Sequence, residues 1–165
     1  MLSAETATGK HPVEAVAVMD RIVARVEQDD LWRGMIEASR AEPERSAADA
    51  IAAAARQVGH TIGAKAIVAF TASGSTALRV ARERPGAPIV GLTPHQATAR
   101  LMAVVWGVHA VIVPDVHSMT EAVTRAARVT LTEGFAVQGD EIVVSAGVPF
   151  GQAGTTNALR VAVVK

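Results

Sequence analysis

Short apolar runs alternate with amphipathic helical segments along most of this 165-residue chain, and this alternation limits its fold more than any other feature. Strands joined by helices imply right-handed crossovers and a mainly parallel sheet with helices on both faces. No helical pattern separates the last two apolar runs, so the last strand should be antiparallel to its neighbour. We therefore predict a three-layer αβα fold of the α/β class, with a five-stranded, mostly parallel sheet whose last strand is antiparallel. The strands are expected at residues 66–70, 88–92, 110–113, 141–145 and 158–164.

Helix start and stop signals fill the intervals between these strands. Ser46, Thr93 and Ser118 each precede an Asp, Gln or Glu by three residues, which is the spacing of a capping box. Pro94 suits a first helical position, and a glycine such as Gly63 is a common helix end. The helices are expected at residues 47–62, 74–84, 94–106 and 119–133.

The N-terminal quarter of the chain lies outside this repeat. Residues 1–10 are predicted to form a loop. A proline followed by apolar residues at helical spacing predicts an N-terminal extra helix over residues 12–39, in which the apolar pattern fades at Asp29-Asp30 before it continues to Ser39. The charged segment 40–45 is interrupted by a proline and is expected to be a linker. The two predicted parts of the chain are residues 1–43 and 44–165.

The composition argues against several classes of partner. Sixteen Lys and Arg balance 16 Asp and Glu, so no basic surplus favours nucleic acid or an anionic membrane. The absence of cysteine excludes disulfides, cysteine-bound zinc and thiol chemistry, and it fits a reducing compartment. No apolar run approaches the roughly 20 residues that span a bilayer, and the N-terminus has no signal-peptide pattern. We expect a cytoplasmic protein with no nucleic-acid and no membrane partner.

One polar turn is the candidate ligand site. Residues 71–76 (Thr-Ala-Ser-Gly-Ser-Thr) follow the first predicted strand and lead into the next helix. In open parallel sheets, ligands bind outside the carboxyl ends of the strands, and a helix N-terminus offers free N–H groups to phosphate. The hydroxyls add donors, and Gly74 allows a ligand to approach the backbone closely. The same residues would also suit a plain N-cap, and they match neither the P-loop nor the dinucleotide-binding motif.

A second polar, glycine-rich stretch, residues 147–157, precedes the last strand. It would serve as the connection between two antiparallel strands. Alternatively, it forms a lid over a ligand held at residues 71–76, which requires the first and fourth strands to be close in the sheet. The candidate lid residues are Gly147, Gly151, Gly154 and Thr155.

The remaining polar residues form no catalytic or metal-binding pattern. The five histidines are scattered without the spacing of a metal site. No G-x-S-x-G motif supports a serine nucleophile, and the acidic pairs fit solvated turns. His95 follows the carboxyl end of a predicted strand, where it would either touch a ligand or simply be exposed. An independent enzyme of flavodoxin-like type would need an acid–base set that these residues do not supply.

Several segments, in order along the chain, resemble the pyruvate kinase family. Residues 1–16 (MLSAETATGKHPVEAV) are similar to the segment that closes the catalytic barrel in that family. Residues 66–77 resemble its A-I-V-x-x-T-x-S-G-x-T-A pattern. The likeness covers almost the whole chain and implies the C-terminal α/β domain, preceded by the last helix of the barrel. Shorter matches lie at residues 84–89, 96–100, 106–108 and 154–157.

The resemblance implies a regulatory and subunit-contact domain, and hence a homo-oligomer. The family transfers a phosphoryl group from phosphoenolpyruvate to ADP with Mg²⁺ and often K⁺, but its catalytic lysine, metal-binding carboxylates and potassium ligands lie in barrel segments with no counterpart here. We therefore expect no catalytic residue, no metal site and no cofactor in this chain, and no activity from it alone. Pyruvate formation by the pure chain in a coupled assay would contradict this expectation.

The resemblance also assigns the turn to an effector phosphate. Ala72 stands where some fructose-bisphosphate-regulated members have lysine, and residues 146–149 lack their Trp-Arg pair. A second phosphate would lose charge-assisted hydrogen bonds of about 1.5–3 kcal/mol each, so the expected effector is a sugar monophosphate or AMP. The alternative is a homodimerisation module that binds no ligand and associates through the last strand or through helix 94–106. The residues carried over as the phosphate site are Thr71, Ser73, Gly74, Ser75 and Thr76.

Overall fold

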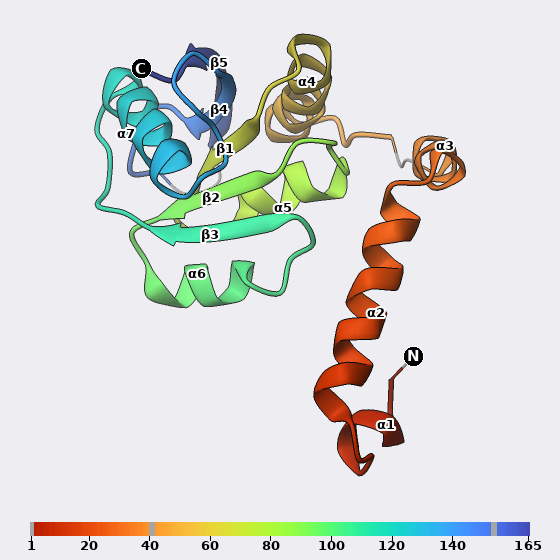
Figure 1. Ribbon diagram of the computed structural model, residues 1–165. Helices are drawn as coiled ribbons and strands as arrows, with labels where there is room; N and C mark the ends of the chain where they lie inside the picture. The colour runs from red at the N-terminus through yellow and green to blue at the C-terminus, as the bar shows by residue number, and fades with distance from the viewer. Residues whose placement is uncertain (1, 40–41, 153–154) are drawn as a thin grey trace. The chain divides into compact units, whose positions relative to one another are not determined.

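The computed structural model describes residues 2–39, 42–152 and 155–165 (Figure 1). Its contacts divide the chain into two compact units, Met1–Ala41 and Glu42–Lys165. The boundary between them lies in the charged segment 40–45, as does the predicted boundary after residue 43. No helix in these described ranges combines the length and apolarity that crossing a bilayer requires.

The first unit contains three helices. A one-turn helix, α1 (Ala4–Ala7), lies within the segment predicted to be a loop, so that prediction is wrong. The single helix predicted over residues 12–39 is also wrong, because the structure has two helices there, α2 (Pro12–Glu27) and α3 (Asp30–Ala38). The break occurs at Asp29, whose backbone is extended and whose carboxylate accepts a hydrogen bond from the Leu31 N–H at 2.9 Å. Aspartate favours such an N-cap because it satisfies a free N–H, and this local bond competes with helix continuation.

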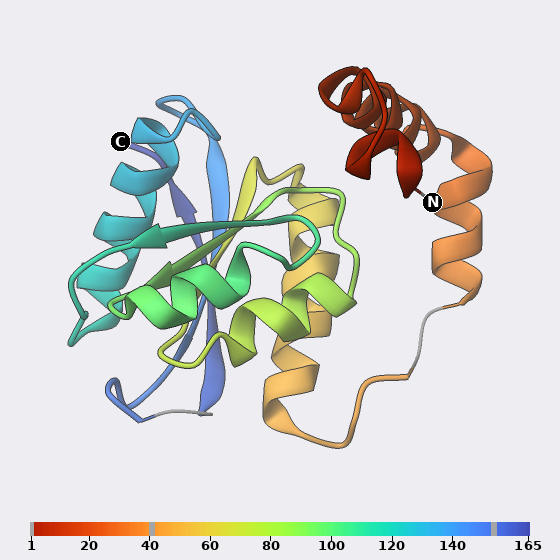
Figure 2. The ribbon, with the colours of Figure 1, turned by 90° about the horizontal axis from the view of Figure 1, so that it is seen from below.

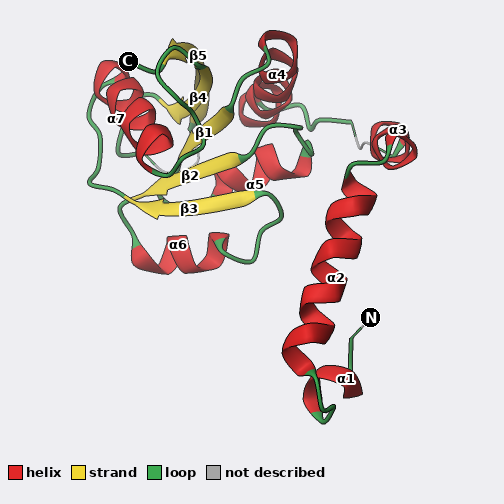
Figure 3. Ribbon diagram, viewed as in Figure 1, coloured by secondary structure: helices red, strands yellow, loops and turns green. Residues whose placement is uncertain are grey.

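The second unit contains one five-stranded sheet with the order β3-β2-β1-β4-β5 (Figure 3). The first four strands are parallel, and β5 is antiparallel to β4, which confirms the predicted fold class. The predicted strand ends differ from the observed ones by at most two residues. The strands are β1 (Ala66–Phe70), β2 (Ile89–Thr93), β3 (Val108–Ile112), β4 (Glu141–Gly147) and β5 (Thr156–Val163).

Helices cover both faces of this sheet (Figures 1 and 2). Helix α7 lies on one face, and α4, α5 and α6 pack on the other. The predicted caps at Ser46 and Ser118 are confirmed, because their hydroxyls accept the N–H groups of Asp49 and Glu121 at 3.2 and 3.1 Å. The helices are α4 (Ala47–Ile62), α5 (Ser75–Arg82), α6 (Gln96–Met102) and α7 (Met119–Thr132).

The predicted capping box at Thr93 is wrong. Thr93 is the last residue of β2, fully buried and paired with Ile112 in the sheet. Its hydroxyl accepts the His95 N–H at 3.3 Å, which shapes a turn. Helix α6 consequently begins at Gln96, without a side-chain cap, and ends well before the predicted residue 106.

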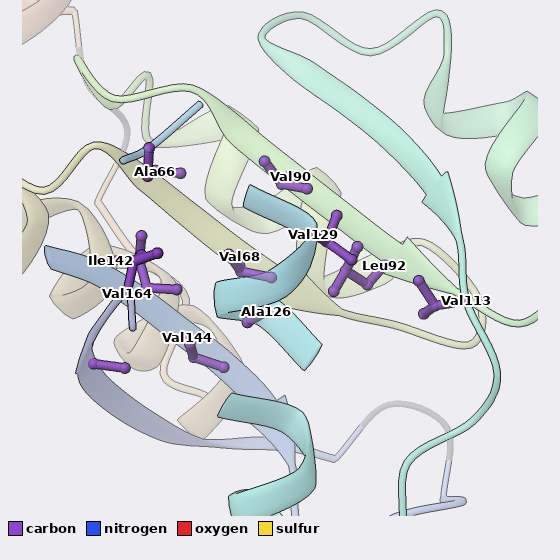
Figure 4. Close-up of a cluster of buried hydrophobic side chains, with 12 residues drawn as sticks. Ala66, Val68, Val90, Leu92, Val113, Ala126, Val129, Ile142, Val144 and Val164 are labelled. Atoms are coloured by element: carbon purple, nitrogen blue, oxygen red, sulfur yellow. The ribbon is translucent and has the colours of Figure 1, made fainter. Parts of the chain in front are cut away.

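The alternation of side chains along the strands builds two cores. Figure 4 shows one of them, in which Val68, Val90 and Val144 of the sheet pack against Ala126 and Val129 of α7. The intervening strand residues form the other core with α4, α5 and α6. Because successive strand residues point to opposite faces, a sheet covered on both sides needs unbroken apolar strands. Because β1 to β4 run parallel, the loops that follow them lie at the same edge of the sheet.

Candidate functional site

A cavity of about 140 Å³ lies at the carboxyl ends of β1 to β4. Figure 3 shows the arrowheads of β2 and β3 pointing toward the same edge of the sheet. Four chain segments that are distant in sequence converge there, one after each parallel strand. This is where open parallel sheets place their ligands. The lining residues from the four segments are Phe70, Thr71, Ala72, Ser73, Ser75 and Thr76; Leu92, Pro94 and His95; Val113, Pro114, Asp115 and Val116; and Gly147, Phe150, Gly151, Gln152, Thr155 and Thr156.

The turn at residues 71–76 contributes four hydroxyl side chains to this cavity. Gly74 does not line the cavity but determines the path of the turn. Its φ of 89° lies in the left-handed region that glycine adopts without strain. In this conformation its N–H donates to Thr71 Oγ1 at 2.8 Å, and this bond is buried.

Two neighbouring elements hold the turn in place from outside. Thr98 of α6 donates its hydroxyl to the carbonyl of Ala72 at 2.8 Å. The hydroxyls of Thr76 and Thr156 lie 2.6 Å apart, which joins α5 to the first residue of β5. Both of these threonines are almost fully buried. The turn is thus fixed before any ligand arrives, and less conformational entropy is lost on binding.

The first turn of α5 presents hydrogen-bond donors to the cavity. Its N-cap, Gly74, has no side chain, and the first helical backbone bond runs from Leu78 N–H to the Gly74 carbonyl at 3.0 Å. Backbone N–H groups before that point have no partner within a helix and carry the positive end of its dipole. Ser73 and Ser75 add hydroxyls that lie 3.2 Å apart. Donors of this kind at a helix start suit a phosphate.

The glycine-rich loop forms the opposite wall. Three of the predicted lid residues, Gly147, Gly151 and Thr155, line the cavity, whereas Gly154 lies outside the described residues. The condition for this arrangement is met, because β1 and β4 are parallel neighbours. A Cβ on Gly147 would approach Thr155 Oγ1 to 2.6 Å and the Thr155 carbonyl oxygen to 3.0 Å. Glycine therefore allows the two ends of the loop to come together.

A side-chain clamp closes the base of the same loop. The Val148 N–H donates to Asn157 Oδ1 at 2.8 Å, and Asn157 Nδ2 donates to the Val148 carbonyl at 2.6 Å. The two bonds imitate a backbone pair at the point where the sheet register between β4 and β5 shifts. They hold Val148 against Asn157 where the loop leaves the sheet.

The described cavity wall contains no lysine and no arginine. His95, which is exposed, is the one basic side chain there, and Asp115 is the one carboxylate. The Asp115 carboxylate accepts the Val116 N–H at 2.9 Å. A bound anion would therefore be held mainly by hydroxyls and backbone N–H groups, and few positively charged side chains would compensate its charge.

The other end of α5 is anchored by a buried charge. Asp49 of α4 is 1% exposed and accepts hydrogen bonds from Arg79 and Arg82 of α5 and from the Glu44 N–H. The Arg82 guanidinium, more than any other neighbour, holds the pKa of the Asp49 carboxyl below its ordinary value. The same contact raises the pKa of Arg82. Helix α5 thus connects the cavity to α4.

Sequence reasoning missed part of this site. Asp115 was not anticipated. Gln152 and Thr156 lie in the predicted stretch 147–157 but were not among the named lid residues, and the contact of Thr156 with Thr76 was not anticipated. Asp115 follows the third strand, so the rule that ligands bind beyond strand ends pointed to it. In the part of the chain that the structure describes, no three His, Asp or Glu side chains come together as metal ligands would.

Comparisons with known proteins agree with this architecture. The family model described as "Pyruvate kinase, alpha/beta domain" matches residues 49–162. A pyruvate kinase of Methylorubrum extorquens is 47% identical over 164 residues, which cover 99% of this chain and 34% of that protein. Pyruvate kinase 2 of Synechocystis sp. is 42% identical over 165 residues, which cover 100% of this chain and 27% of that protein.

Solved structures give the same result. The crystal structure of a pyruvate kinase from Cryptosporidium parvum has a TM-score of 0.85 and 27% sequence identity, and the match covers 100% of this chain and 32% of that one. A second crystal structure of pyruvate kinase from this organism has a TM-score of 0.82 and 26% identity. The chain spans about a third of the length of the relatives that it matches.

Proposed function

This chain belongs to the pyruvate kinase family, of which it contains the C-terminal α/β domain, and from that premise we propose that its cavity binds a monophosphorylated effector. One observation carries the proposal: four hydroxyl side chains and the first turn of α5 face one cavity at the carboxyl ends of the parallel strands. The glycine-rich loop forms the other wall of that cavity. The ligand class is a sugar monophosphate or AMP.

The donor set supports one phosphate. Three hydroxyl residues, Ser73, Ser75 and Thr76, line the cavity, and two of them belong to the first turn of α5, whose N–H groups lack helical partners. They supply enough donors for the oxygens of a single phosphate group. A second phosphate would meet a described wall without lysine or arginine and with Asp115 in it. The oxygens of that phosphate would lose their hydrogen bonds to water and gain few from the protein. This cost disfavours a bisphosphate.

The apolar part of the wall supports an organic group attached to that phosphate. Phe70, Val113, Val116 and Phe150 line the cavity together with the polar residues. Such side chains provide contact area for the sugar or base, whereas the few polar groups orient it. Both Gln152 and Asp115 line the cavity. The amide of Gln152 can donate to or accept from ligand hydroxyls, and the carboxylate of Asp115 can accept from them.

The proposal assigns enzymatic activity to the whole protein and not to this chain alone. The family resemblance implies phosphoryl transfer from phosphoenolpyruvate to ADP. We assign this chain a regulatory part in that reaction and no catalytic residue. Effector binding would then change activity through contacts with the remainder of the enzyme.

Substitution of the turn hydroxyls tests the proposed site. Ser73→Ala and Thr76→Ala should each weaken binding of AMP and glucose 6-phosphate by roughly 10- to 100-fold, because each removes a charge-assisted hydrogen bond of about 1.5–3 kcal/mol. Isothermal titration calorimetry of the chain measures both affinities. Thr124→Ala is the matched control, since Thr124 is exposed on α7, away from the cavity. Failure of the unaltered chain to bind AMP, glucose 6-phosphate or inorganic phosphate would sink the proposal.

A homodimerisation role is the second candidate. Strand β5 is at the edge of the sheet, where Val161 and Val163 are 41% and 46% exposed. On α6 and just after it, Leu101 and Val104 are 50% and 88% exposed. Edge strands with apolar side chains are templates for pairing with a second copy. Analytical ultracentrifugation should then detect a dimer that Val161→Lys dissociates, whereas a monomer at every concentration would count against this candidate.

A further inference from the structure

We propose that Thr156 is a positioning residue that directs the hydroxyl of Thr76 toward the phosphate of the bound ligand. This inference rests on the proposed function, because it needs an anion in the cavity. It gives a positioning role to a residue of β5, the strand that follows the glycine-rich loop, beside the turn at residues 71–76. Thr156 would act through Thr76 without bonding to the ligand itself.

The geometry brings the two threonines into close contact. Thr76 Oγ1 and Thr156 Oγ1 are 2.6 Å apart, although the residues are 80 positions apart in sequence. Thr76 is 3% exposed and Thr156 is 4% exposed, yet both line the cavity. Hydroxyl–hydroxyl bonds at this distance are short and well formed. Because both side chains are almost fully buried, each hydroxyl gains from the partner that the other provides.

The direction of this bond determines what Thr76 offers. A hydroxyl has one proton to donate and two lone pairs to accept with. When Thr156 donates to Thr76 Oγ1, the proton of Thr76 remains available for the ligand. A phosphate only accepts hydrogen bonds from these groups, so an anion in the cavity favours this direction. Two hydroxyls linked in series toward an anion also polarise each other, which strengthens the outer bond.

The alternative orientations of Thr76 are restricted. A threonine inside a helix often donates to the carbonyl four residues earlier, but Thr76 is the second residue of α5, and the carbonyl four residues before it, that of Ala72, lies outside the helix. That carbonyl already accepts the hydroxyl of Thr98 at 2.8 Å. Thr76 also lies in the first turn of α5, next to Ser75, where the donors of the proposed phosphate site converge. The side-chain hydrogen bond that the structure gives for Thr76 is the one to Thr156, and the inference assigns the orientation of the Thr76 hydroxyl to it.

Substitutions at both positions test the inference by calorimetric titration with AMP and with glucose 6-phosphate. Thr156→Val keeps the shape of the side chain, removes the hydroxyl and should weaken binding about 10-fold. Thr156→Ser restores the hydroxyl and should return affinity to within about twofold of the unaltered chain. The double variant Thr156→Val/Thr76→Val should bind no more weakly than Thr76→Val alone, since Thr156 acts through Thr76. Thr156→Ala serves in place of Thr156→Val if the latter does not fold.

Four outcomes would overturn the inference. In the first, Thr156→Val and Thr156→Ala both bind with the affinity of the unaltered chain, while Ser73→Ala binds more weakly. This result would leave the proposed function intact and remove the role of Thr156. A Thr156→Ser variant as weak as Thr156→Val would indicate packing of the methyl group. Additive losses in the double variant would indicate that Thr156 contacts the ligand directly. No binding by the unaltered chain would remove the proposed function and this inference together.

Discussion

Asp49→Asn is expected to lower the free energy of unfolding by about 2 kcal/mol. Asp49 is 1% exposed, and its carboxylate accepts hydrogen bonds from Arg79 Nε at 3.0 Å, from Arg82 and from the Glu44 N–H at 3.0 Å. The asparagine amide has the same shape but carries no charge and places donors where acceptors are needed. Breaking a buried ion pair costs about 3–5 kcal/mol. Arg79 and Arg82 are 33% and 43% exposed, so solvent reduces that cost.

The same residue should make stability depend on acid. Arg82 holds the pKa of Asp49 below its ordinary value in the folded chain, whereas the unfolded pKa is about 3.9. Between the two values the unfolded state binds more protons, so stability rises with pH there. The contribution of Asp49 is therefore complete above the unfolded pKa and is lost as pH falls through the lower folded value. The difference in stability between the unaltered chain and Asp49→Asn should shrink below about pH 4.

Urea denaturation followed by circular dichroism at pH 7 and at lower pH measures both effects. Glu133→Gln is the matched control, because Glu133 pairs with His109 at 2.9 Å while their side chains are 35% and 47% exposed. An exposed pair contributes about 0–1 kcal/mol, so this variant should stay within about 0.5 kcal/mol of the unaltered chain. An equal loss in the free energy of unfolding for Asp49→Asn and Glu133→Gln would refute the claim that burial makes the ion pairs of Asp49 more stabilising than an exposed pair.

Ile67→Ala should cost more, about 3–4 kcal/mol of the free energy of unfolding. Ile67 is fully buried in β1, the central strand, and belongs to the core that α4, α5 and α6 cover. Its Cδ1 lies 3.4 Å from the position that a Cβ on Gly59 would occupy, so α4 and the strand are already in close contact. Alanine would leave a cavity that the packed strands and helices on either side cannot fill by a small movement. Large-to-small substitutions of this kind cost about 2–5 kcal/mol.

Ile112→Ala is the control for this prediction. Ile112 ends β3 at the edge of the sheet, where its side chain is 54% exposed. It should lose less than about 1 kcal/mol, from strand propensity and partial burial. Urea denaturation at pH 7 measures both variants, and the comparison holds if the denaturant dependence of the free energy is unchanged. A loss for Ile112→Ala as large as that for Ile67→Ala would contradict the layered core described above.

Local signals in the sequence determined most of the elements. Apolar runs located the five strands to within two residues, and Ser46, Ser118 and Gly63 marked helix ends that the structure confirms. These signals work because capping and strand burial depend on groups only a few residues apart. The helix break at Asp29 and the false cap at Thr93 show the limit of such signals. The same residue type, here threonine, can cap a helix or end a buried strand. Only its pairing with a neighbouring strand shows which of the two roles it has.

The candidate site was likewise only partly predictable from the sequence. The turn at residues 71–76 was recognisable because its hydroxyls and glycine are contiguous between a strand and a helix. The pairing of Thr76 with Thr156 and the burial of Asp49 beneath two arginines depend on which strands and helices are neighbours. That arrangement follows from closing long segments of chain around a common core, and no short stretch of sequence contains it. Local patterns in the sequence thus located the strands, most of the helices and the polar turn at residues 71–76. The distant side chains that contact this turn follow from the tertiary structure, because hydroxyls 80 residues apart meet only after the sheet has formed.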